Sequence, residues 1–149
     1  MCTLPAAVSP GKPVTDFTLT FPPEPRWVRG ARDAVRTALA PLVPAGSGVL
    51  ETAALLTSEL VTNAVSAALA CVSVSPVELH AEWTSNGAIR VLVHDDAPGE
   101  PRPPRGVPDV EAEHGRGLLL LSLYATDWGV CRHVPRGGKI VWFTLDGWD

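Results

Sequence analysis

Five stretches of the chain alternate apolar and polar residues, and this period of two predicts β-strands. They are Phe17–Phe21, Val77–Trp83, Ala88–His94 and the segments DWGVCRHV (127–134) and KIVWFTL (139–145). The Asn86-Gly87 pair between the second and third stretches is a strong signal for a tight hairpin turn. A second hairpin is expected around Pro135–Gly138. Hairpins join antiparallel strands, so most of the sheet should be antiparallel.

Two longer segments repeat apolar residues with the period of an α-helix. The first begins near Trp27 and ends before Pro41, because proline cannot continue a helix. The second runs from about Val49 to Leu69, and a third helix is expected to begin near Gly115. The resulting order is strand, helix, helix, hairpin, loop, helix, hairpin. It predicts an α+β fold, a two-layer sandwich of a mixed, mostly antiparallel sheet with helices on one face.

The length of the chain and its even distribution of elements predict one domain. Residues 1–16, rich in Pro, Ala, Gly and Ser, are expected to be a flexible N-terminal leader, and residues 17–149 form the domain. Residues 97–113 hold five prolines and should form a long loop. The sequence has neither a GxxxxGK[ST] phosphate loop nor a GxGxxG turn after a strand, which excludes the βαβ nucleotide folds.

Composition narrows the class of protein further. Hydrophobic residues make up 46% of the 149, and the formal net charge is −4 without any run rich in Lys and Arg. Direct nucleic-acid binding is therefore not expected, since it needs clustered positive charge. Neither a signal peptide nor an apolar run of the ~20 residues that a membrane helix needs is recognised. The three widely spaced cysteines indicate neither a disulfide framework nor a zinc site, so we expect a reduced, cytoplasmic protein.

The long second helix carries an unexpected polar pair. At about 100° per residue, Glu59 and Asn63 share one face with Thr52, Thr62 and Ser66, opposite an apolar face. A polar face is usually solvated surface, but this one has almost no long charged side chains. Asn is also a mediocre helix former, and a carboxylate beside a carboxamide suits Mg²⁺. At this point, solvated surface and binding site are both open.

Two further segments offer ligand chemistry. In VLVHDDAPGEP a strand ends at Asp95, whose carboxylate can accept a ligand amino group beside a tight turn. In EHGRGLLLLSL, Gly115 and Gly117 flank the start of an apolar helix, whose first N–H groups favour anions. Each segment taken alone also fits an ordinary turn or a flexible helix entry.

The three segments together resemble a known family. SELVTNAV (58–65), VHDDAPGEP (93–101) and HGRGLLLLSLYATDWGV (114–130) are similar, in order and spacing, to the nucleotide-binding boxes of the GHKL (Bergerat) ATP-binding fold. That fold occurs in histidine kinases, DNA gyrase and MutL proteins. The resemblance extends over about residues 17–145 and is strongest to the small anti-sigma-factor serine kinases of the RsbW and SpoIIAB type, especially stand-alone actinomycete regulators.

The resemblance implies a function for each matching residue. Asn63 would coordinate a Mg²⁺ ion that bridges the ATP phosphates. Glu59 would be the catalytic residue, acting as the base or orienting the attacking group for γ-phosphoryl transfer. Asp95 would accept a hydrogen bond from the adenine amino group, with Ala97 and Gly99 shaping the base pocket. Ala97 stands where the family's D-x-G-x-G motif has its first glycine.

The same resemblance implies how the phosphates are held. An ATP lid would run from Glu100 to His114. The start of the following helix would wrap the phosphates with Gly115, Arg116, Gly117 and Leu118. The expected cofactors are therefore ATP and Mg²⁺.

The expected function is that of an ATP-binding regulator with protein serine kinase activity, which phosphorylates an anti-sigma antagonist in a partner-switching pathway. Its partners would be a sigma factor, the antagonist or both, and the resemblance also allows a homodimer. The Ala97 replacement and the short proline-rich lid leave two alternatives open. One is a catalytically weak, nucleotide-gated protein-binding module, and the other is a scaffold without nucleotide binding.

Overall fold

The computed structural model describes residues 13–72, 75–84, 87–97, 117–132, 134 and 137–146, with side chains from residue 16 onward. Along the chain the elements are β1 (Pro13–Phe21), α1 (Trp27–Leu39), α2 (Val49–Ala70), β2 (Val77–Thr84), β3 (Ile89–Asp95), β4 (Asp127–Cys131) and β5 (Lys139–Leu145). A further helix occupies residues 117–124, before β4.

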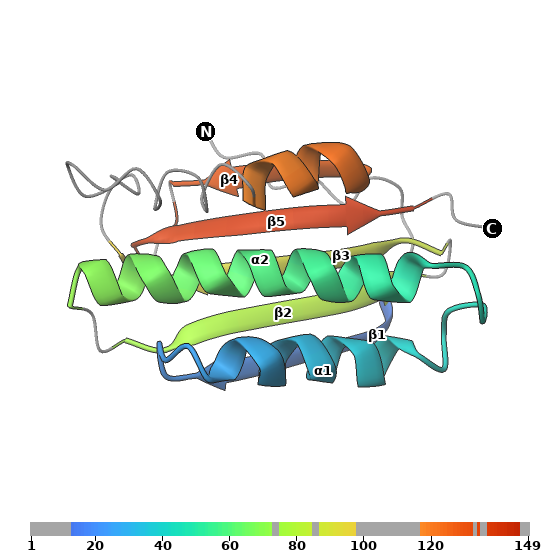
Figure 1. Cartoon of the computed structure of the whole chain (residues 1–149), viewed down its shortest axis with the longest axis horizontal. Coiled ribbons are helices and arrows are strands. Elements are labelled where there is room, and N and C mark those ends of the chain that lie inside the picture. The colour runs from blue at the N-terminus through green and yellow to red at the C-terminus, as the bar shows by residue number, and fades with distance from the viewer. Residues whose placement is uncertain are drawn as a thin grey trace.

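The five strands form one sheet in the order β1-β2-β3-β5-β4. Each neighbouring pair within the described residues is antiparallel. Figure 1 shows α1, α2 and the 117–124 helix on one side of this sheet, and α2 packs against β2, β3 and β5. The predicted two-layer α+β fold is confirmed. The sheet, predicted to be mixed, is antiparallel throughout the described part of the chain.

The element boundaries follow the sequence pattern closely, with one extension. β1 begins at Pro13 rather than Phe17 and pairs its first residues with the end of β2. This is an edge strand, where a proline at the first position costs no ladder hydrogen bond. Residues 13–16, assigned to the leader on sequence, therefore belong to the sheet. The rest of the predicted leader and most of the predicted loop, residues 98–113, lie outside the described residues.

The predicted β2–β3 hairpin is present. Its turn brings the N–H of Gly87 to the carbonyl of Thr84, at 3.0 Å. Gly87 has a φ of +82°, a conformation that glycine adopts without strain. Asn86 lies outside the described residues.

The core lies between α2 and the middle of the sheet. Val77, Leu79 and Ala81 point inward from β2 and are buried, as their period of two requires. From α2, Leu56, Leu60 and Val61 are fully buried against them. This packing fixes which side of α2 is turned toward the sheet, and it thereby fixes where the polar pair of α2 lies.

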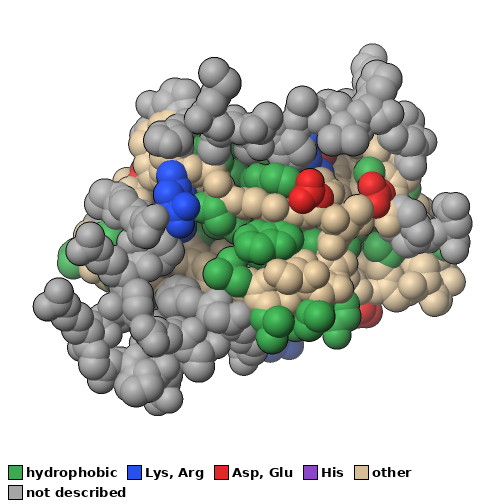
Figure 2. Space-filling view, turned by 90° about the horizontal axis from the view of Figure 1, so that it is seen from above, with side chains coloured by type: hydrophobic (Ala, Val, Ile, Leu, Met, Phe, Trp, Pro, Cys, Tyr) green, Lys and Arg blue, Asp and Glu red, His purple; other side chains and the backbone are tan. Residues whose placement is uncertain are grey.

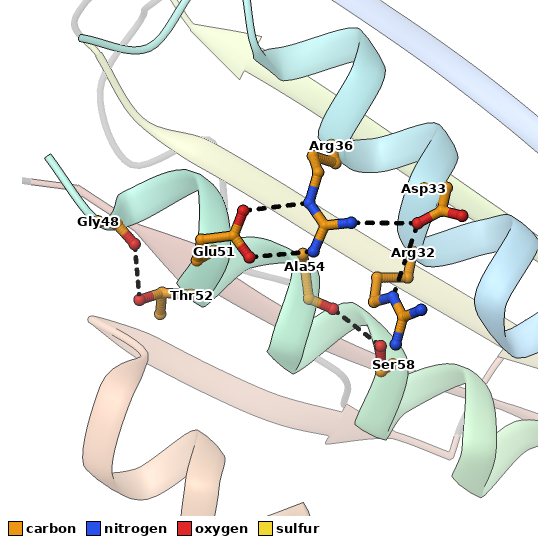
Figure 3. A network of polar contacts seen from close by, with 8 residues as sticks. All are labelled: Arg32, Asp33, Arg36, Gly48, Glu51, Thr52, Ala54 and Ser58. Atoms are coloured by element: carbon orange, nitrogen blue, oxygen red, sulfur yellow. Dashed lines mark hydrogen bonds and ion pairs between the residues drawn. The ribbon is translucent and has the colours of Figure 1, made fainter. Parts of the chain in front are cut away.

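A polar network joins the two long helices near the N-terminus of α2 (Figure 3). Arg36 of α1 donates two hydrogen bonds to the carboxylate of Glu51, at 3.1 and 3.0 Å, and a third to Asp33 at 3.1 Å. The hydrogen bonds to Glu51 raise the pKa of the Arg36 guanidinium. This two-bonded contact between Arg36 and Glu51 helps to orient α1 relative to α2. It adds little to the free energy of unfolding, because the side chains are exposed.

Two expectations from composition need correction. α2, with 22 residues, is long and apolar enough to cross a membrane, although most of its apolar window is buried inside the protein, as in the core helix of a soluble protein. Cys71 is a free, exposed thiol, but Cys131 is disulfide-bonded. Spacing along the chain does not report proximity in space, so the cysteine pattern does not establish a reducing compartment.

Candidate functional site

The polar pair on α2 lies beside Gly117, the first described residue of the helix before β4. A Cβ atom placed on Gly117 would lie 3.2 Å from Asn63 Nδ2 and 3.4 Å from Glu59 Oε2. Glu59 is only 8% exposed, and Asn63 is half-buried. The interpretation of this face as solvated surface is therefore wrong at Glu59. Two of the three segments singled out from the sequence lie in direct contact.

This contact has the features of an anion and metal site. Glycine at position 117 leaves open the space that a Cβ would fill beside the two α2 side chains. The first N–H groups of a helix have no intrahelical partner and attract anions. The oxygens of Glu59 and Asn63 are of the type that Mg²⁺ prefers, and Mg²⁺ usually takes one or two protein ligands plus phosphate oxygens. The residues present fit a magnesium–phosphate group.

Within the described ranges, no group of three or more His, Cys, Asp and Glu side chains forms a metal site. A magnesium ion at Asn63 would therefore depend on phosphate oxygens to complete its coordination. The donor set thus fits an ion that arrives with a nucleotide rather than a permanently bound one.

The third segment forms a second cluster at the end of β3. Asp95 is 1% exposed and pairs in register with Lys139, the first residue of β5. Its Oδ1 accepts the backbone N–H of Ala97 at 3.0 Å, and its Oδ2 accepts a hydrogen bond from Lys139 Nζ at 2.7 Å. Both oxygens of the carboxylate are thus held in place. The result is a buried ion pair in which each charge compensates the other.

The turn before β5 locks this cluster. Gly138 has a φ of +74°, and a Cβ on it would overlap the carbonyl oxygen of Asp95. One residue earlier, His94 Nε2 donates to the carbonyl of Gly137 at 2.9 Å. Only glycine at position 138 lets the β5 backbone run this close to the end of β3.

The Asp95–Lys139 cluster lies at one end of the sheet. The end of β3 pairs with the beginning of β2, through His94 and Glu78, and β2 follows the C-terminus of α2. Asp95 is thus at the end of the sheet toward which the C-terminal half of α2 points (Figure 1). The Asp95–Lys139 pair and the residues around Gly117 are the two clusters of candidate site residues.

Several of the predicted site residues lie outside the described part of the chain. Gly99, Gly115, Arg116 and the predicted lid (Glu100–His114) lie outside the described residues. Ala97 is buried, and its N–H is used by Asp95. The side chain of Leu118 is 41% exposed.

Sequence reasoning missed Lys139 and Gly138. One signal was present: in KIVWFTL, a period of two places Lys139 on the same face as Val141, Phe143 and Leu145. A lysine on the apolar face of a strand requires a buried partner. The pattern predicts that such a partner exists but does not say that it is Asp95.

The fold and the two clusters together define a class of protein. An antiparallel sheet with helices on one face, a strand-end carboxylate and a helix start beside a Glu/Asn pair characterise an α+β nucleotide-binding domain. The model of the histidine kinase-like ATPase domain family matches residues 21–145, so the chain belongs to this family. It is an ATP-binding domain of the GHKL type. Among curated proteins, none matches the chain.

Proposed function

We propose that this ATP-binding domain uses Mg-ATP as a protein serine kinase of the RsbW and SpoIIAB type, phosphorylating an anti-sigma antagonist in a partner-switching pathway. The observation that carries the proposal is the contact of Gly117 with both Glu59 and Asn63. It supports the proposal because a carboxylate and a carboxamide, a possible metal ligand, lie beside the helix that would hold the phosphates.

The chemistry follows from this arrangement. Phosphoryl transfer needs mainly positioning and neutralisation of charge, with one group to orient the attacking hydroxyl or take its proton. Asn63 Oδ1 would hold the metal ion, which supplies that neutralisation. Glu59 Oε2 would orient the serine hydroxyl of the substrate protein. Burial of Glu59 limits its choice of hydrogen-bond partners, which suits a positioning carboxylate.

A protein partner is supported by the surface next to this site. Four large hydrophobic side chains of the 117–124 helix are exposed, with exposed fractions from 41% to 64%: Leu118, Leu119, Leu123 and Tyr124. Figure 2 looks onto the edge of the molecule that carries this helix and β4, and it shows hydrophobic side chains open to solvent there. Exposed apolar patches mark protein interaction sites. We assign the sigma factor or the antagonist to this edge.

The test is Glu59→Gln, which keeps the size of the side chain and removes its charge. The antagonist for the assay is recovered by co-purification from native cells. Transfer of γ-phosphate to its serine should fall about 10²-fold or more, the contribution usual for a positioned acid–base group. Mg-ATP affinity measured by calorimetry should change little. Ser66→Ala, about two turns further along α2 and exposed, is the matched control and should retain full transfer. Equal transfer by Glu59→Gln would remove Glu59 from catalysis.

The second candidate is a nucleotide-gated binding module with little turnover. One observation favours it: at 8% exposure, Glu59 offers little room for a substrate hydroxyl. In that case no phosphoserine forms on the antagonist, even with the wild-type protein. Instead, exchanging ATP for ADP changes the affinity for the partner, and Glu59→Gln leaves that difference intact.

A further inference from the structure

Lys139 has unused hydrogen-bonding capacity that the proposed function leaves unexplained. Its side chain is 4% exposed, and its ammonium group makes one hydrogen bond, to Asp95 Oδ2 at 2.7 Å, within the described part of the chain. An ammonium group has three N–H donors. Buried donors normally find acceptors, so two donors of a buried charge remain to be accounted for. A ligand with an acceptor atom at this place would account for at least one of them.

Asp95 has matching capacity. An ionised carboxylate offers about four acceptor positions, and Ala97 and Lys139 use two of them. Because both oxygens are held, the carboxylate cannot rotate and its free positions are fixed. The pair therefore presents a fixed acceptor next to a fixed donor, 2.7 Å apart.

The backbone keeps this acceptor and donor together. Asp95 and Lys139 are direct partners in the antiparallel ladder between β3 and β5. The close approach of Gly138 to the backbone of Asp95 holds the beginning of β5 against the end of β3. The acceptor–donor pair is thus built into the sheet and does not depend on a loop.

We infer that Lys139 donates a hydrogen bond to ring nitrogen N1 of the adenine base while Asp95 accepts one from the 6-amino group. This inference rests on the proposed binding of the nucleotide base at Asp95. Adenine carries a donor, its 6-amino group, beside an acceptor, a ring nitrogen. The Asp95–Lys139 pair presents an acceptor beside a donor and therefore complements this arrangement. The side-chain amide of Asn or Gln offers the same acceptor and donor when it binds adenine. Guanine has an acceptor and an N–H in these two places, so it presents the opposite order. Lys139 is therefore a specificity-determining residue for the base.

The alternative is that Lys139 only neutralises Asp95. A pair of ligands separates the two possibilities: ATP, and 1-deaza-ATP, in which a C–H group replaces N1. Calorimetry is carried out with both nucleotides on the wild-type protein and on Lys139→Met. A hydrogen bond from a charged donor corresponds to about tenfold or more in affinity. The wild type should therefore bind ATP at least about tenfold more tightly than 1-deaza-ATP, whereas Lys139→Met should bind the two equally.

The ATP affinity is divided by the 1-deaza-ATP affinity for each protein. A substitution that weakens the binding of both nucleotides equally leaves this ratio unchanged. If Lys139→Met fails to fold, Lys139→Gln replaces it, because Gln still donates to Asp95 but is too short to reach the base as well. Its ratio should also fall toward one. Equal affinities in the wild type, or an unchanged ratio in the variant, would overturn the inference while leaving ATP binding intact. Failure of the wild-type protein to bind ATP at all would overturn the proposed function as well.

Discussion

The Gly117→Ala variant tests whether the residues around Gly117 bind the nucleotide, because it should weaken Mg-ATP binding while the protein remains folded. The added Cβ would lie 3.2 Å from Asn63 Nδ2 and 3.4 Å from Glu59 Oε2. The distance to Asn63 is tight, so this side chain must give way by a few tenths of an ångström, whereas the distance to Glu59 is at the lower limit of ordinary contact. Overpacking of this kind costs roughly 1–3 kcal/mol, and the better helix propensity of Ala returns up to about 1 kcal/mol. The net loss of unfolding free energy should be small, about 2 kcal/mol or less by these values.

The same substitution should also weaken nucleotide binding, an effect measured independently of the stability of the fold. The methyl group fills the space between the helix start and the Glu59–Asn63 pair, where the phosphates and the metal ion are proposed to bind. Mg-ATP affinity measured by calorimetry should fall at least about tenfold, which corresponds to about 1.4 kcal/mol. Circular dichroism and thermal denaturation confirm that the variant is folded, with about 2–4 °C expected per kcal/mol for a domain of this size.

Gly30→Ala is the matched control. Gly30 lies inside α1, and its added Cβ would meet Trp27 Cε3 at 3.6 Å, an ordinary contact. This variant should gain up to about 1 kcal/mol of stability and leave Mg-ATP affinity unchanged. If Gly117→Ala binds Mg-ATP as tightly as Gly30→Ala does, the phosphates do not lie between Gly117 and the polar pair of α2.

Three further variants test the remaining parts of the site. Gly138→Ala should lower the free energy of unfolding by about 2–5 kcal/mol, since a left-handed residue costs about 1–2 kcal/mol and the backbone overlap about 1–3 kcal/mol more. A Cβ on Gly137 would have nothing within 4 Å, so Gly137→Ala should lose only the cost of the left-handed conformation, as measured by chemical denaturation. Equal losses of unfolding free energy in the two variants would contradict the backbone overlap at Gly138. Asp95→Asn leaves the ammonium of Lys139 buried without its carboxylate and should cost about 3–5 kcal/mol, so an unchanged denaturation midpoint would contradict the buried pair. Asn63→Ala should weaken ATP binding more with Mg²⁺ present than in EDTA, and equal weakening would remove Asn63 as a metal ligand.

Local patterns in the sequence were sufficient to predict the fold. Strand and helix periods, the Gly87 turn and the prolines around α1 depend on neighbouring residues, and the structure places the elements within a few residues of the predictions. The largest difference is the start of β1, where pairing with β2 extends the strand to Pro13. Such pairing depends on a partner far along the chain, which a local pattern does not contain.

The site was only partly determined by the sequence. Helix periodicity places Glu59 and Asn63 on one face, but it leaves both solvated surface and binding site open. The contact with Gly117, more than fifty positions further along the chain, is what turns that face into a candidate site. The partner of Lys139 is 44 positions away and is decided by the antiparallel register of β3 and β5. The sequence by itself determined most of the residues that carry chemistry, although not Lys139. Only the tertiary structure decided which of them meet, because burial and register result from packing of the whole chain.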